Sequence, residues 1–321
     1  MKTFLGLLAF AAILSAQPLR LETTIPLPNV EGRIDHFSVD VSGQRLFVSA
    51  LGNNTLEVVD LKAGKVAHTI RGVKEPQGLF YWPETNRLYA ANADDGHVRV
   101  YDGSSFQLLH EYELSGDADN IRFDPQAKEI FVGYGNGALA VINADLKANV
   151  GETMLDAHPE SFQLEKQGPR IFINVPEAGN VTVVDRRTRT VKEKWPVTGA
   201  KSNFPMALDE ANHRLFLGCR RPAKLLVLDT ANGKQIAGVD ITGDTDDLFY
   251  DAAKKRIYVS GGAGSVSVLQ QKDPDHYETI ATIPTAPGAR TSLFVPDFKR
   301  LYVARPHRGK VGAALLVFAV E

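Results

Sequence analysis

The sequence predicts an all-β protein, a seven-bladed β-propeller with four-stranded antiparallel blades, in which an N-terminal strand closes the last blade. Three observations predict this fold. One strand pattern occurs seven times, the pattern recurs about every 42 residues, and a strand missing from the C-terminal end is present near the N-terminal end. A four-stranded unit repeating at this interval is typical of a propeller blade.

The recurring pattern is a short apolar strand that usually starts with Arg followed by Leu or Ile. Its starts are separated by 42, 42, 41, 44, 42 and 44 residues. The seven segments are RLFVSAL (45–51), RLYAANA (87–93), EIFVGYG (129–135), RIFINVP (170–176), RLFLGCR (214–220), RIYVSGG (256–262) and RLYVARP (300–306). A constant spacing over the whole chain indicates seven structural repeats.

Each repeat contains four short strands. A strand such as FSVDV precedes the segment above, a strand such as TLEVVDL follows it, and a more variable strand such as KVAHTIRG completes the unit. Alternating apolar residues and β-branched residues indicate half-buried strands. We place the blades at residues 34–72, 73–116, 117–157, 158–199, 200–243, 244–285 and 286–321, the last with 19–27.

The two ends of the repeat region complement each other. After the seventh segment the chain supplies one more strand, ALLVFAV (314–320), and no fourth. Residues 19–27, LRLETTIPL, resemble the outer strand YETIATIPT at 277–285. We expect 19–27 to complete the last blade, because this closes the ring and removes an exposed sheet edge. Residues 17–321 are therefore predicted to form a single propeller domain.

Residues 1–16, MKTFLGLLAFAAILSA, have the layout of a secretory signal peptide. One lysine precedes a short apolar run, and small residues end it. The run is too short to span a bilayer, and no cysteine follows it as a site for a lipid anchor. We expect a secreted or periplasmic protein without a membrane anchor.

The composition excludes some function classes. The chain carries 36 basic and 38 acidic side chains, a formal charge of −2, which does not suggest nucleic-acid binding. Its single cysteine, Cys219, excludes an internal disulfide. Arg220 and Arg221 beside Cys219 would lower the pKa of its thiol, and the alternative is that Cys219 is a small residue at a strand end. We expect a monomer.

The strand motifs resemble a known family. RLFVS, RIYVS and RLYVA are followed by a turn that reads Val58, Val59, Asp60, Gly64, Lys65 in one repeat, and Val227, Leu228, Asp229, Gly233, Lys234 in another. These motifs resemble the YVTN-type seven-bladed β-propeller repeat family of secreted and periplasmic bacterial proteins. The resemblance covers residues 17–321. It implies the propeller fold, and it implies a binding role more often than a catalytic one.

A repeated acidic phrase indicates a candidate site. GDADNIRFD (116–124) returns as GDTDDLFYD (243–251), 127 residues later, which corresponds to three repeats. Each phrase lies where the chain enters the innermost strand of a blade, at one rim of the central channel. Two positions before the first apolar residue of that strand stand Asp35, Gln77, Asp119, Glu160, Phe204, Asp246 and Thr291. One position before it stand His36, Gly78, Asn120, Ser161, Pro205, Asp247 and Ser292.

Carboxylate, amide and imidazole groups at a channel mouth are ligands for Ca²⁺ or another divalent cation. Crowded carboxylates repel each other, so a cation or raised pKa values are expected there. The metal candidates are Asp35, His36, Asp119, Asn120, Glu160, Asp246 and Asp247, with His158 on the same rim and Asn203 replacing Phe204 after a one-residue slip. The alternative is that these acids only form turns by capping their own backbone.

Arginines predict an anion-binding part of the same rim, because a guanidinium group pairs bidentately with carboxylate or phosphate. They follow the second strands of blades 5 and 7 or enter blade 7. The candidates are Arg220, Arg221, Arg290, Arg305, His307 and Arg308. The alternative is that these arginines only neutralise the blade 6 acids Asp244, Asp246 and Asp247.

Two main functions remain open. The first is a binding propeller that captures a small anionic or metal-linked ligand, or a partner protein, at this rim. The second is a divalent-metal-dependent lactonase or lyase, since the arrangement is similar to gluconolactonase-like propellers, which usually have six blades. The matching residues would come from Asp35, Asp119, Asn120, Glu160, Asn203 and Asp246. A purely structural interaction platform is a third class.

No motif predicts another cofactor. The sequence has no Gly-x-Ser-x-Gly elbow, phosphate loop, zinc spacing or haem-attachment cysteine pair. The tryptophan docking turns of quinone-cofactor propellers are also absent. We therefore expect no PQQ, haem or nucleotide.

Overall fold

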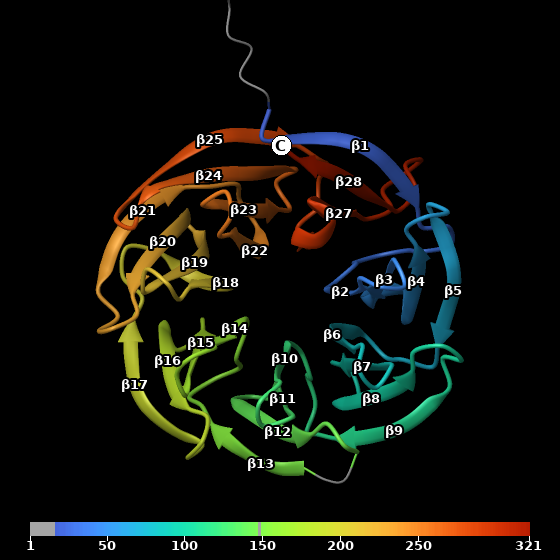
Figure 1. Ribbon diagram of the computed structural model, residues 1–321, viewed down its shortest axis with the longest axis horizontal. Coiled ribbons are helices and arrows are strands. Elements are labelled where there is room, and N and C mark those ends of the chain that lie inside the picture. The colour runs from blue at the N-terminus through green and yellow to red at the C-terminus, as the bar shows by residue number, and fades with distance from the viewer. Residues whose placement is uncertain (1–16, 147–148) are drawn as a thin grey trace, which may run out of the picture.

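The computed structural model describes residues 17–146 and 149–321. The predicted signal peptide, residues 1–16, lies outside the described residues. Seven four-stranded sheets form a ring around a central channel, as Figure 1 shows. The all-β, seven-bladed prediction is therefore confirmed, and each blade is antiparallel throughout.

Blades 1 to 3 follow the predicted order, from the channel outward. Blade 1 comprises β2 (Phe37–Asp40), β3 (Arg45–Ala50), β4 (Thr55–Asp60) and β5 (Lys65–Arg71). Blade 2 comprises β6 (Pro76–Trp82), β7 (Arg87–Asn92), β8 (His97–Asp102) and β9 (Leu108–Glu113). Blade 3 comprises β10 (Ile121–Asp124), β11 (Glu129–Tyr134), β12 (Ala138–Asn143) and β13 (Asn149–Met154).

Blades 4 to 6 repeat this order. Blade 4 comprises β14 (Phe162–Leu164), β15 (Arg170–Val175), β16 (Asn180–Asp185) and β17 (Thr190–Pro196). Blade 5 comprises β18 (Lys201–Asp209), β19 (Arg214–Arg221), β20 (Ala223–Asp229) and β21 (Gln235–Asp240). Blade 6 comprises β22 (Thr245–Asp251), β23 (Arg256–Gly261), β24 (Ser265–Asp273) and β25 (His276–Pro284).

The seventh blade joins both ends of the described chain. It comprises β26 (Ser292–Val295), β27 (Arg300–Arg305), β28 (Ala314–Val320) and, as its outermost strand, β1 (Leu19–Pro26). β1 pairs antiparallel with β28, from Leu19 opposite Val320 to Pro26 opposite Ala314. The prediction that an N-terminal strand closes the ring is confirmed, and Figure 1 shows β1 lying outside β28.

The apolar second strand of each repeat is buried on both faces because a neighbouring blade packs against each of them. In β3, every residue from Leu46 to Ala50 is buried, whereas the outer strand β5 is exposed at most positions. Phe47 of blade 1, for example, packs in one cluster with Leu79 and Leu88 of blade 2. Burial on both faces replaces the simple alternation of a one-sided sheet with a continuous apolar run.

The arginine that starts most of these segments has a structural role. Arg45 donates to the Asp40 carboxylate at 2.7 Å, and Asp40 also accepts the backbone N–H of Gly43 at 2.9 Å. The Arg45 guanidinium lies 5.5 Å from the centre of the Phe47 ring. The pair holds the tight turn between the first and second strands of blade 1, and Arg170 pairs with Glu165 at the equivalent turn of blade 4.

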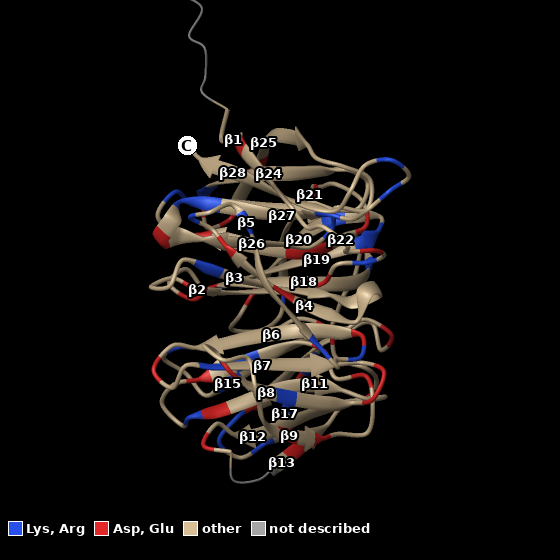
Figure 2. Cartoon of the chain, turned by 90° about the vertical axis from the view of Figure 1, so that its right-hand side faces the viewer, with Lys and Arg blue, Asp and Glu red and all other residues tan. Residues whose placement is uncertain are grey.

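The innermost strands β2, β6, β10, β14, β18, β22 and β26 surround the channel. Their preceding connections therefore reach one face of the disc, where the sequence placed the candidate site. Figure 2 shows the disc from the side, with charged residues of both signs in the loops of both faces. Among the described residues, no helix is long and apolar enough to cross a membrane.

Candidate functional site

The two sets of side chains at the entry of the inner strands line two adjoining cavities. We call the first cavity the vestibule, and it has a volume of about 210 Å³. In the alignment of the inner strands, five of the seven residues that stand two positions before the first apolar residue line the vestibule. These are Gln77, Asp119, Glu160, Phe204 and Asp246. All seven residues one position before it line the second cavity, of about 430 Å³, which we call the inner chamber. Because successive residues of an extended chain alternate in direction, the two sets separate.

His36 lines both cavities and lies among three carboxylates. Its Nε2 atom is 3.4 Å from Asp35 Oδ1 and 3.9 Å from Asp119 Oδ1. Its Nδ1 atom is 3.3 Å from Asp247 Oδ1. Burial alone would lower the pKa of His36, but Asp247 and Asp35 raise this pKa to about 10. His36 is therefore an imidazolium at neutral pH.

Asp119 has polar partners in addition to His36. Asn120 Nδ2 donates to Asp119 Oδ2 at 3.0 Å, and His158 Nε2 lies 4.0 Å from the same oxygen. Burial works to raise the pKa of Asp119, but the His158 and His36 cations lower it overall. His158 is also tied to the Gly135 carbonyl oxygen at 2.6 Å. Although burial lowers the pKa of His158, Asp119 and Gly135 raise it to about 9.

On the opposite side of the vestibule, arginines pair with the blade 6 acids. Arg220 donates to Asp246 Oδ1 at 2.5 Å and to the Thr245 carbonyl at 2.8 Å, and its guanidinium lies 3.7 Å from the centre of the Phe204 ring. Arg290 pairs with Asp244 at 2.9 Å. These pairs match the alternative in which the arginines neutralise blade 6, except that Asp247 pairs with His36 instead.

Neutralisation of the carboxylates is incomplete. Asp35 Oδ1, Asp119 Oδ1 and Asp246 Oδ2 are buried and accept no hydrogen bond. Burial raises the pKa values of Asp35 and of Asp246, the latter to about 6. Burial, together with Asp119 and Asp246, raises the pKa of Glu160 to about 8. Two of these three oxygens belong to Asp119 and Asp246, which line the vestibule, and the third belongs to Asp35, next to His36. The Glu160 carboxyl of the vestibule is mostly protonated at neutral pH.

The metal prediction stays a prediction. Among residues 17–146 and 149–321, no group of three His, Cys, Asp or Glu side chains has an arrangement able to hold a metal ion. The His36 imidazolium lies between Asp35 and Asp119, where it supplies positive charge to both. Repulsion among the crowded carboxylates is reduced by cations of the chain itself, such as His36, and by the raised pKa values of Glu160 and Asp246.

Of the six predicted anion-binding residues, Arg220 and Arg290 line the vestibule and the other four do not. Arg221 is exposed and points away from Arg220, as neighbouring residues of a strand do. Arg305 donates to the Gly312 carbonyl, and His307 pairs with Glu31 at 2.7 Å. Arg308 is exposed and pairs through its backbone with Val311. Arg305 ends β27, and His307 and Arg308 belong to the connection that leads outward to β28.

Two other residues considered from the sequence also lie outside the vestibule. Asn203 is buried and donates to Asn174 Oδ1 at 2.7 Å, so Phe204, and not Asn203, is the blade 5 residue at the vestibule. Cys219 is buried in the core, and burial raises the pKa of its thiol to about 12. The raised pKa excludes a reactive thiolate at neutral pH.

Sequence reasoning missed three cations that line the two cavities: Lys166, which lines the inner chamber in a connection between strands, and the arginines Arg33 and Arg122. Arg33 pairs with Asp35 Oδ2 at 2.5 Å and lines the vestibule. Arg122 lines the inner chamber. Strand alternation is the signal that would have found both arginines, because Arg33 lies two residues before Asp35 and Arg122 lies two residues after Asn120.

Known proteins that resemble the chain support the fold. No family model matches. The uncharacterized protein YncE of Salmonella typhimurium is 24% identical over 281 residues, covering 83% of this chain and 67% of that protein. The YncE protein of Salmonella typhi is 26% identical over 262 residues, covering 76% of this chain and 73% of that protein.

Solved structures agree at the level of fold. The WD40 repeats of RRP9 superpose with a TM-score of 0.79 at 10% identity, covering 95% of this chain and 98% of that chain. A chain of the mitotic checkpoint complex gives a TM-score of 0.77 at 13% identity, covering 100% and 99%. A chain of Kuenenia stuttgartiensis hydrazine synthase gives 0.75 at 18% identity, covering 84% and 92%. At these identities the similarity shows the propeller fold alone.

The vestibule predicts a stability that falls as pH rises. Folding raises the pKa values of Glu160, Asp246, His36 and His158, so between about pH 4 and 10 the folded chain binds more protons than the unfolded chain. The free energy of unfolding falls between about pH 4 and 8 as the carboxyl groups lose their protons, and above about pH 6.5 as the imidazolium groups lose theirs. We expect urea denaturation to give a larger free energy of unfolding at pH 5 than at pH 9.

The substitution Glu160→Gln tests the origin of this trend. It removes the carboxyl that folding keeps protonated, so the decline between about pH 4.5 and 8 is expected to become shallower. Asp156→Asn, at a solvent-exposed ion pair with Lys194, is the matched control and should leave the pH profile unchanged. Equal slopes for the wild type and Glu160→Gln would show that Glu160 ionises normally.

Proposed function

We propose that the protein is a ligand-binding propeller whose vestibule binds a small molecule carrying both a cationic and an anionic group. The observation that carries the proposal is the set of three buried acceptor oxygens on Asp35, Asp119 and Asp246. A buried acceptor without a donor costs free energy, typically about 1–3 kcal/mol. A ligand ammonium group, or a cation bound to the ligand, would satisfy these oxygens.

The anionic end of the ligand has partners at the mouth. The Arg33 side chain is 48% exposed and the Arg290 side chain is 29% exposed, so both guanidinium groups remain accessible although each pairs with a carboxylate. Arg220 is more enclosed and is fixed by Asp246 and Phe204. Carboxylates deep in the vestibule and arginines nearer its mouth would orient a ligand with its cationic group inward.

A divalent-metal-dependent lactonase or lyase is the second candidate. Glu160 favours it, because a carboxyl with a pKa of about 8 holds a proton at neutral pH and can act as a general acid. It lines the same vestibule as Asp119 and Asp246, two metal candidates that each carry one unsatisfied oxygen. A divalent ion, when bound, would polarise a carbonyl group of the substrate.

The wider setting of the proposal comes from the sequence. The resemblance to the YVTN-type repeat family and the pattern of residues 1–16 support a secreted or periplasmic binding protein. A partner protein that inserts a charged side chain into the vestibule would use the same groups as a small ligand. A partner protein would cover a larger area of the disc face than a small molecule would.

Isothermal titration with small probes tests the proposal. Glycine, β-alanine and γ-aminobutyrate carry both charges, methylamine and acetate carry one each, and CaCl₂, MgCl₂ and MnCl₂ test the cation alone. We expect at least one zwitterion to bind more tightly than methylamine or acetate. Asp246→Asn should weaken that binding roughly 10-fold, the effect of losing one charge-assisted hydrogen bond.

Controls separate the two candidates. Asp156→Asn should leave binding unchanged, and thermal unfolding should confirm that Asp246→Asn folds. A divalent ion that binds alone and is lost in Asp119→Ala supports the metal-dependent enzyme, and turnover of a lactone panel then decides between enzyme and binder. No binding by any probe, or equal binding by wild type and Asp246→Asn, would contradict the proposed vestibule site.

A further inference from the structure

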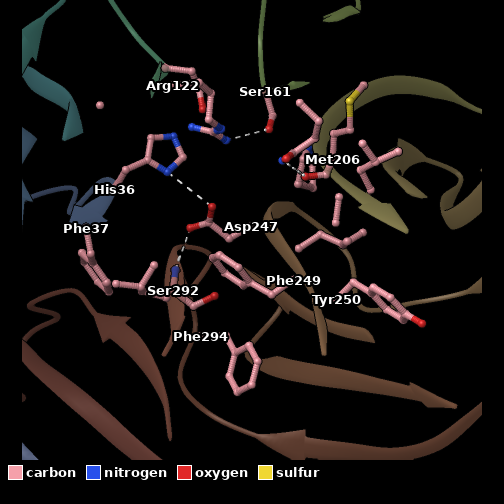
Figure 3. A pocket seen from close by; sticks show the side chains of 18 of the residues that line it. His36, Phe37, Arg122, Ser161, Met206, Asp247, Phe249, Tyr250, Ser292 and Phe294 are labelled. Atoms are coloured by element: carbon pink, nitrogen blue, oxygen red, sulfur yellow. Dashed lines mark hydrogen bonds and ion pairs between the residues drawn. The ribbon is translucent and has the colours of Figure 1, made fainter. Parts of the chain in front are cut away.

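The inner chamber is a second site with different chemistry. It adjoins the vestibule at His36 and extends along the inner strands as far as Tyr250 and Pro296. Its volume of about 430 Å³ is within the range of small-molecule sites, roughly 300–1,000 Å³. Figure 3 shows its polar end at His36, Arg122 and Ser161, across from Phe249 and Phe294.

The charged residues that line the inner chamber give it an excess of positive charge. They are three cations, His36, Arg122 and Lys166, and one carboxylate, Asp247. Asp247 is already satisfied, since its Oδ2 accepts the Ser292 backbone N–H at 2.7 Å and its Oδ1 contacts His36 at 3.3 Å. Asp247 and His36 therefore offset each other, and the remaining cations lack a counter-charge in the chamber.

Among the described residues, Arg122 is a cation of the inner chamber that forms no ion pair. Its guanidinium donates to the Ile121 carbonyl at 2.8 Å and to Ser161 Oγ at 3.3 Å, both neutral acceptors. Within the described part of the chain it has no carboxylate within 4 Å. Burial lowers the pKa of Arg122, although Asp247 and Asp119 act against this. An enclosed guanidinium with two neutral partners retains donors for an anion.

The remainder of the wall is mostly apolar. The apolar lining includes Phe249, Phe294, Leu248, Met206 and Leu208. Figure 3 places Arg122 and Ser161 opposite Phe249 and Phe294, so a ligand that contacts both needs a polar end and an apolar body. Lys166 is exposed, and it lines the same chamber. Apolar walls with few convergent polar groups are typical of small-molecule sites.

We propose that the inner chamber binds a small organic carboxylate with an apolar or aromatic body, its carboxylate on Arg122 and Ser161 and its body against Phe249 and Phe294. This site is separate from the proposed zwitterion site, because the vestibule has carboxylates with unsatisfied oxygens and arginines that are paired with carboxylates, whereas the chamber has a guanidinium without an ion pair. Arginine suits this role, because its planar fork binds both carboxylate oxygens at once.

The probe pair benzoate and benzamide tests the proposal on the full chain, because the two differ mainly in charge. We expect benzoate to bind at least about 10-fold more tightly than benzamide in isothermal titration. Arg122→Gln should weaken benzoate binding roughly 10- to 100-fold and leave the weak binding of benzamide unchanged. Removing an unpaired cation should not lower the thermal stability of the chain.

Two further variants keep the test decisive. Lys166→Glu changes an exposed residue, so it is expected to fold, and its reversed charge should weaken benzoate binding several-fold. Asp246→Asn, in the vestibule, should leave benzoate binding unchanged, which separates this site from the proposed zwitterion site. If Arg122→Gln does not fold, Lys166→Glu and a crystal soaked with 4-bromobenzoate still test the proposal.

A crystal soaked with 4-bromobenzoate locates the ligand directly. The bromine anomalous peak is expected beside Phe249 and Phe294, with the carboxylate on Arg122. Equal binding of benzoate and benzamide, binding unaffected by Arg122→Gln or Lys166→Glu, or a bromine peak elsewhere with an empty inner chamber would each overturn the proposal.

Discussion

A chain that begins at Leu27, and therefore lacks β1, is expected to lose its cooperative unfolding transition or to unfold roughly 10 °C or more below the full chain. Leu19 and Ile25 are 1% and 3% exposed, and their burial alone contributes about 3–6 kcal/mol. A typical domain has a free energy of unfolding of about 5–15 kcal/mol. The truncation also leaves β28, whose seven residues are all buried, as an unpaired edge strand.

Differential scanning calorimetry and size-exclusion chromatography check this expectation. A chain that begins at Gln17 is the control and should behave like the full chain, because it retains every residue of β1. A synthetic peptide of residues 17–27 added to the truncated chain should restore part of the lost stability. A truncated chain that stays monomeric with an unchanged melting temperature would contradict closure of the ring by β1.

Asp247→Ala is expected to lower the free energy of unfolding by up to about 3–5 kcal/mol, the usual cost of leaving a buried charge without its partner, because the only carboxylate beside His36 Nδ1 is lost while Asp35 and Asp119 stay beside Nε2. The substitution removes the carboxylate beside the His36 imidazolium and the acceptor of the Ser292 backbone N–H. Both groups are enclosed, with 20% of the His36 side chain exposed and Ser292 buried. Urea denaturation at pH 7 measures the change.

Two further variants serve as comparisons for the loss of stability in Asp247→Ala. Asp247→Asn keeps an acceptor for Ser292 but loses the negative charge, so its loss of stability should be smaller than that of Asp247→Ala. Asp156→Ala removes an exposed ion pair with Lys194 and should change stability by less than about 0.5 kcal/mol. A loss in Asp247→Ala no larger than that of Asp156→Ala would contradict the role of Asp247 as a main counter-charge of His36 and show that Asp35 and Asp119 are sufficient.

The fold was predictable because its determinants are local and repeated. The Arg–Leu or Arg–Ile segments recur at a nearly constant interval, and in blade 1 the segment combines the Asp40 turn with a strand buried on both faces. The closing strand was predictable because residues 19–27 match the outer-strand pattern of 277–285. Each of these signals depends on neighbouring residues and on the spacing between repeats, both of which a single sequence contains.

The positions around the channel were also predictable, because seven equivalent strand entries converge on one axis. Alignment on the first apolar residue identified the vestibule residues Asp119, Glu160 and Asp246, and every residue one position later lines the inner chamber. Strand alternation fixes the direction of a side chain when the register is known.

The pairing of charges within the site was not predictable from the sequence. His36 of blade 1 contacts Asp247 of blade 6, five blades later in the chain, and this contact depends on the channel width. Arg220 and Arg221 are neighbours with the same chemistry, yet only Arg220 lines the vestibule. Which arginine points inward depends on the register of β19, and Lys201 lies opposite Arg221 in that register.

We propose that a ligand in the vestibule satisfies the unsatisfied carboxylate oxygens of Asp119 and Asp246, which line it, and of Asp35, which lies next to His36. A crystal structure of the chain with the tightest-binding zwitterion from the titrations tests it most directly. We expect ligand density in the vestibule, with the cationic group within hydrogen-bond distance of at least two of the three oxygens. Density located elsewhere, or three carboxylates each bonded to donors of the protein itself around an unoccupied vestibule, would contradict it.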